Sequence, residues 1–149
     1  MLRILILLCI LLSSITAVKA QNISKDDWDW QKKWFDSIAQ QIDTNPRIAQ
    51  RNFTGRCTAG SYNAVCFYNK TKKEIVRIRY TFTEDSIGVK TAYYNNSLLI
   101  KFIDNKTAYY STLQYLVNEQ GEKASPDTTK YLSGILDESW PVIYKLLFE

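Results

Sequence analysis

The segments EIVRIRYTFT (residues 74–83) and VKTAYYNNSLLIKFIDNKTAYY (residues 89–110) decide the fold expected for this chain. Apolar and polar side chains alternate along both, and Asn or Asp residues interrupt the pattern at short intervals. A period of two is typical of half-buried β-strands, and Asn and Asp favour tight hairpins because they tolerate positive φ. We therefore expect a five-stranded antiparallel meander, with strands over residues 61–68, 74–83, 89–94, 97–103 and 106–117.

A helical pattern lies on each side of these strands. Ser24, followed three residues later by Asp27, indicates a helix start, and Asn45-Pro46 indicates its end. Within this helix the apolar stripe is expected to be the core face rather than a docking surface, and it consists of Trp30, Trp34, Phe35, Ile38, Ala39 and Ile42.

The second helical pattern runs from Ser125-Pro126 to the C-terminus, with Ser as N-cap and Pro at the first helical position. Pro141 should kink or split this helix. The resulting fold class is α+β, with both helices packed on one face of the sheet. No internal repeat or linker is evident, so residues 21–149 are expected to form a single domain.

Residues 1–20 have the pattern of a secretory signal peptide. Arg3 precedes an apolar run from Ile4 to Leu12, and Val18-Lys19-Ala20 offers a small-residue cleavage site. Extended to Ile15, the run would be a helix of about 18 Å, too short for a bilayer core of about 30 Å. We expect cleavage, export to the periplasm or the extracellular space, and no transmembrane segment afterwards. Loss of Arg3 and Lys19 would lower the formal net charge from +4 to +2, so no nucleic-acid partner is expected.

Two cysteines remain after cleavage, Cys57 and Cys66. An oxidising compartment favours a structural disulfide between them. A reactive thiol pair is the alternative, but the spacing is not Cys-x-x-Cys.

The chain contains no histidine. This excludes Ser-His-Asp and Cys-His catalysis and histidine-based zinc sites. No metal or cofactor is expected, and a hydrolase that uses paired carboxylates stays as a remote alternative.

Strand alternation predicts one face that gathers basic and tyrosine side chains. With Asn95-Asn96 and Asp104-Asn105 as two-residue turns, Lys90 would lie directly opposite Lys101. The residues expected on this open face are Arg77, Arg79, Lys90, Lys101, Tyr94 and Tyr110, together with Lys106. Such a face either binds an acidic protein surface or an anionic glycan, or is an ordinary solvated face.

Five Asn-x-Ser/Thr sequons are spread over the N-terminus, the loops and the expected turns, at Asn22, Asn52, Asn69, Asn95 and Asn105. They favour a secreted glycoprotein, although turns enrich the same residue types and the Asn, Lys, Ile and Tyr-rich composition equally suits a small exported bacterial protein.

The first functional expectation is an exported, non-enzymatic binding or inhibitory module that uses the basic face. The alternative is a carrier of a small molecule or lipid, with a pocket between the helices and the sheet. Its expected lining is Trp30, Trp34, Tyr93, Tyr109 and Trp140.

Overall fold

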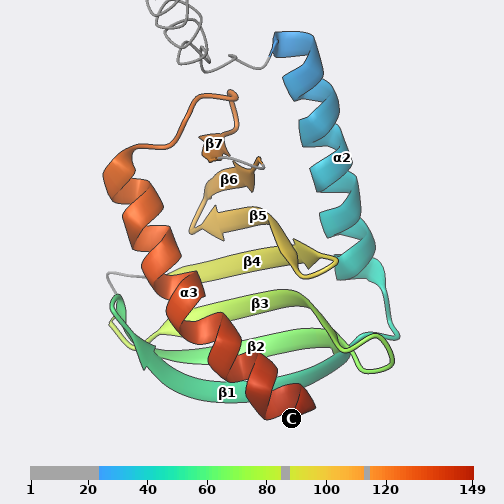
Figure 1. Cartoon of the computed structure of the whole chain (residues 1–149), viewed down its shortest axis with the longest axis vertical. Coiled ribbons are helices and arrows are strands. Elements are labelled where there is room, and N and C mark those ends of the chain that lie inside the picture. Colours follow the sequence, from blue (N-terminus) through green and yellow to red (C-terminus); the bar gives the residue numbers. More distant parts are fainter. Residues whose placement is uncertain (1–23, 85–87, 113–114) are drawn as a thin grey trace, which may run out of the picture.

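The computed structural model describes residues 24–84, 88–112 and 115–149. The expected signal peptide and the sequon at Asn22 lie outside the described residues. The chain forms two helices and a seven-stranded antiparallel sheet whose strands lie side by side in chain order (Figure 1). The elements are α2 (Lys25–Thr44), β1 (Ala49–Cys57), β2 (Gly60–Asn69), β3 (Glu74–Phe82), β4 (Val89–Asn95), β5 (Leu98–Asp104), β6 (Thr107–Ser111), β7 (Leu116–Asn118) and α3 (Pro126–Phe148).

The α+β class and the meander are therefore confirmed, but the predicted strand count of five is wrong. The predicted first strand is β2, and β1 precedes it along the edge of the sheet. The alternation of β1 was missed because Phe53 and Cys57 are its only fully buried side chains, and polar residues surround them. The predicted last strand, 106–117, is divided into β6 and β7.

The helices pack on opposite faces of the sheet, which corrects the expectation of a single covered face. The neighbours Tyr93 and Tyr94 in β4 show this, because successive side chains of a strand point to opposite faces. The Tyr93 hydroxyl donates to Asp43 of α2, whereas the Tyr94 ring lies 6.5 Å from the ring of Trp140 in α3. In Figure 1, α3 crosses in front of β3, β2 and β1. Two apolar clusters result, one between α3 and the sheet and one between α2 and the sheet.

The face that α2 buries differs from the predicted stripe. Trp28, Phe35 and Ala39 are buried, whereas Trp30 is 68 % exposed and Trp34 is 44 % exposed. Phe35 and Ala39 belong to the predicted stripe, so this part of the prediction is confirmed, but its two tryptophans are exposed. The buried face is rotated from the predicted stripe by about a sixth of a turn, toward Trp28.

The helix ends follow the predicted signals. The Ser24 and Ser125 hydroxyls accept from the backbone N–H groups three residues on, and α2 ends before Asn45-Pro46. The predicted split of the second helix does not occur, because α3 continues through Pro141 to Phe148.

The hairpin turns lie one residue later than predicted. Asn96 and Ser97 both have positive φ, +50° and +64°, and they form the two-residue loop between β4 and β5. A bulge follows, since Tyr94 pairs with Leu99 and Tyr93 with Lys101, which leaves Ile100 without a cross-strand partner. A bulge re-aims side chains, and here Ile100 joins the cluster under α2.

Candidate functional site

The predicted basic face does not exist as one surface, because the sheet separates its members. Arg77, Lys101 and Tyr110 lie on the face that α2 covers, as their contacts with acidic residues of that helix show. Lys90 and Tyr94 lie on the face that α3 covers. Arg79 is exposed on β3.

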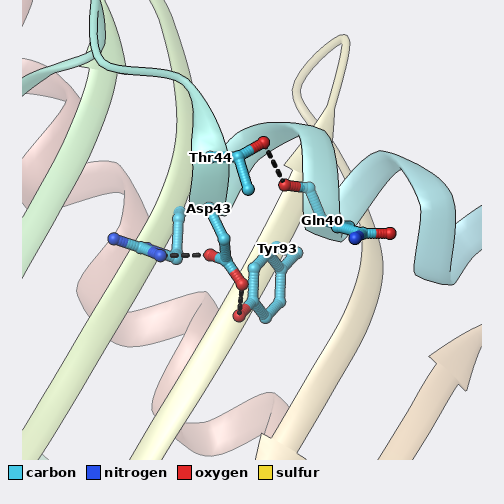
Figure 2. A network of polar contacts seen from close by, with 5 residues as sticks. Gln40, Asp43, Thr44 and Tyr93 are labelled. Atoms are coloured by element: carbon cyan, nitrogen blue, oxygen red, sulfur yellow. Dashed lines mark hydrogen bonds and ion pairs between the residues drawn. The ribbon is translucent and has the colours of Figure 1, made fainter.

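Two aspartates of α2 engage the basic residues beneath it. Asp43 accepts from the Arg77 guanidinium and, at 3.1 Å, from the Tyr93 hydroxyl (Figure 2). Burial and the neighbouring Asp43 charge raise the pKa of Tyr93 to about 12. These contacts fix the last turn of α2 to the sheet.

Asp36, two turns earlier in α2, makes an equivalent pair of contacts. It accepts from Lys101 Nζ at 2.6 Å and from the Tyr110 hydroxyl at 3.0 Å. A cation that is already paired with an aspartate contributes less binding energy to an acidic partner.

Lys90 is 3 % exposed and forms an ion pair with Asp104, its cross-strand neighbour. The predicted opposition of Lys90 and Lys101 is therefore wrong, and the cause is the one-residue shift of the hairpin together with the bulge. The ammonium group also lies 5.8 Å from the centre of the Tyr131 ring of α3.

The predicted disulfide is not formed, and both thiols are free and buried. Cys57 pairs with Gly60 at the closed end of the β1–β2 hairpin, whereas Cys66 pairs with Arg51. Six residues of strand correspond to about 20 Å, far beyond the roughly 7 Å that a disulfide can bridge. Burial raises the pKa of both thiols, that of Cys66 to about 12, so neither is a reactive thiolate.

The four sequons within the described residues lie on β1 and at hairpin ends. Asn52 and Asn105 are exposed, and Asn69 and Asn95 are half-buried. The Asn105 and Asn69 side-chain oxygens accept from Val89 N and Lys72 N. Glycosylation of these residues remains a prediction.

A cleft of about 500 Å³ lies between α3 and the β4–β7 part of the sheet. Tyr94, Leu116 and Leu136 are buried at its floor, with Leu99 and Trp140 beside them. Desolvation by burial raises the pKa of Tyr94 well above its usual value, so the hydroxyl keeps its proton. The cleft therefore has an aromatic and aliphatic base.

Polar side chains line the remaining walls. Thr129, Ser133 and Asp137 follow one another at four-residue spacing on α3, which places them on one side of the helix. Ser97 and Ser111 contribute hydroxyls from the sheet. None of the described residues that line the cleft is a lysine or arginine.

Trp140, one of the residues that line this cleft, carries an unsatisfied donor. Its Nε1 is buried and has no hydrogen-bond partner among the described residues. The indole stacks on Tyr144, with ring centres 4.9 Å apart and planes 23° apart. A buried N–H without a partner costs free energy that an added acceptor would recover.

Of the five residues expected to line a carrier pocket, only Trp140 lines this cleft. Trp30 and Trp34 are exposed, and Tyr93 lies on the other face. One signal of this site was available in the sequence. Polar side chains recur every four residues beside an apolar helix stripe, at Thr129, Ser133 and Asp137. Only the tertiary structure shows that this side of the helix faces a cleft rather than open solvent.

No group of three or more potential metal ligands gathers within the described ranges. Neither of the two helices described is both long and apolar enough to cross a membrane. Comparison with protein-family models, curated proteins and solved structures gives no match to this chain.

Proposed function

We propose that this protein is a non-enzymatic binding module, exported from the cytosol, that holds a small molecule in the cleft between α3 and β4–β7. The observation that carries the proposal is the cleft itself, which combines a buried apolar floor, hydroxyl-bearing walls and the unpaired Trp140 N–H. Its volume of about 500 Å³ is within the range of small-molecule sites.

The basic sheet surface supports binding of an acidic partner less well. Arg77, Lys101 and Lys90 are each paired with an aspartate. A new anion would have to compete with those carboxylates. Arg79 on β3 and Lys106 in the β5–β6 turn are the exposed cations of the predicted set, and two exposed cations give little affinity or specificity.

Binding is also better supported than catalysis. Asp137 is the one carboxylate among the described residues that line the cleft. Glycoside hydrolysis by carboxylates needs two of them on opposite sides of the reacting bond. A neutral tyrosine, hydroxyls and a single exposed acid suit recognition.

The test is a saturation-transfer NMR screen, in which a library of charged and uncharged small molecules is tested for binding to the exported chain. Ser133→Phe places a ring in the cleft, and Ser37→Phe makes the same change at an exposed position of α2. We expect ligands whose signals disappear with Ser133→Phe and persist with Ser37→Phe. The proposal is overturned if nothing binds, or if every bound ligand is retained by a folded Ser133→Phe variant.

A further inference from the structure

We infer that the cleft takes an uncharged saccharide, with one sugar ring lying against the Trp140 side of the floor. This inference rests on the proposed function and names the chemical class of its ligand. It follows from the charge, the hydroxyl content and the aromatic surface of the cleft, each considered below.

The charge of the cleft disfavours an anionic ligand. The described lining contains the Asp137 carboxylate and no cation, so a sulfate, phosphate or uronate would meet repulsion without compensation. A cationic ligand gains little either, because Asp137 is exposed and ion pairs at exposed positions contribute about 0–1 kcal/mol. Hydrogen bonds and ring contacts must therefore supply the affinity.

The polar groups of the walls match a polyhydroxylated ligand. Ser97, Ser111, Thr129 and Ser133 offer hydroxyls, which both donate and accept, and Asp137 accepts only. Sugar hydroxyls also donate and accept, so one ligand type satisfies all of these groups. The Ser111 hydroxyl already donates to Thr112 O at 3.2 Å, and it can still accept from a ligand. An apolar lipid would take water from the half-buried Thr129 and Ser133 hydroxyls without replacing its hydrogen bonds.

The aromatic floor matches the apolar C–H face of a sugar ring. The centre of the Trp140 ring lies 4.9 Å from that of Tyr144, on which it stacks, and 6.5 Å from that of Tyr94. Leu99 and Leu136 also belong to the lining. A flat indole supplies a large contact area at a small cost in conformational entropy. The unpaired Trp140 N–H is itself buried, so it would reach a sugar oxygen only when the ring turns toward the ligand.

The experiment titrates the exported chain with uncharged mono- and disaccharides covering hexoses, pentoses, deoxyhexoses and N-acetylhexosamines. A sulfated disaccharide and choline serve as the charged comparisons, and two-dimensional NMR gives both affinity and location. We expect binding by at least one uncharged sugar, unchanged by about 1 M NaCl, where the Debye length is only about 3 Å. Backbone shifts should concentrate on β4–β7 and α3.

Three variants test the assigned contacts. Trp140→Phe keeps a ring but removes the N–H, and should weaken sugar binding about three- to tenfold, the usual effect of one hydrogen bond. Trp34→Phe makes the same change at an exposed site on α2 and should leave affinity unchanged. Asp137→Asn retains an acceptor, and should weaken an uncharged sugar less than Trp140→Phe does.

The outcomes separate the inference from the proposed function. If the charged compounds or other library members bind the cleft and no uncharged sugar does, the saccharide inference is wrong and the binding function stands. If no compound of any class binds there, both are wrong. Sugar binding that is insensitive to both Ser133→Phe and Trp140→Phe would overturn the assignment of the cleft.

Discussion

Truncation of two tryptophans in α2, Trp28 and Trp30, should change stability by very different amounts. Trp28 is 3 % exposed, its ring centre lies 5.4 Å from that of Tyr110, and its Nε1 donates to Glu119 O at 3.2 Å. Trp30, two residues away, is 68 % exposed. A tryptophan buries about 200 Å², which at about 25 cal/mol per Å² corresponds to ~5 kcal/mol as an upper value.

We therefore expect Trp28→Ala to lower the free energy of unfolding by about 3–5 kcal/mol, and Trp30→Ala to change it by about 0.5 kcal/mol or less. Urea denaturation followed by far-UV circular dichroism measures both, and the two variants serve as each other's control. A larger loss for Trp30→Ala would mean that the predicted stripe is the buried one. The placement of α2 on its own face of the sheet would then be wrong.

Three further predictions follow from the buried groups. In the absence of reductant, iodoacetamide should label Cys57 and Cys66 of the urea-unfolded protein but neither thiol of the folded protein, and mass spectrometry measures the labelling. If the unfolded protein takes no label, the two residues form a disulfide and the prediction is wrong. Asp104→Asn should cost about 3 kcal/mol in urea denaturation, because it leaves the ammonium of Lys90 buried without its counter-charge; a loss below about 1 kcal/mol would contradict that burial. Because burial raises the pKa of Cys66 from 9.0 to about 12 and that of Tyr93 from 10.0 to about 12, the unfolded chain loses these protons first as pH rises. Stability should then fall between pH 9 and 12, by ~3 kcal/mol at about pH 11 from the thiol alone. A urea midpoint that is the same at about pH 8 and 11 would refute this.

Local signals in the sequence predicted local structure well. The Ser24 and Ser125 caps, the Asn45-Pro46 stop and the alternation along β2–β5 each act over a few residues, and the structure has the corresponding elements. The predicted hairpins failed by a single residue, because Asn96 and Ser97 rather than Asn95 and Asn96 adopt positive φ. Since side chains alternate along a strand, that shift and the bulge at Ile100 changed which residues meet across the sheet.

The candidate site was less accessible to sequence reasoning. The predicted pocket and the observed cleft share Trp140, because its aromatic side chain and helical position are visible in the sequence. The other lining residues are far apart in the sequence; Ser97 and Asp137, for example, are 40 positions apart. Whether they lie in one cleft depends on the angle at which α3 packs over β4–β7. No local pattern encodes that angle.

By itself the sequence determined the α+β class, the ends of both helices and the exclusion of histidine chemistry, because caps, periodicity and residue inventory are properties of short segments. The tertiary structure alone decided that the helices lie on opposite faces, that Cys57 and Cys66 are too far apart to bond, and that the basic residues are divided between two surfaces. These outcomes depend on strand register and on the side of the sheet that each helix takes. Both are set by the sum of many long-range contacts, which no short segment of the sequence encodes.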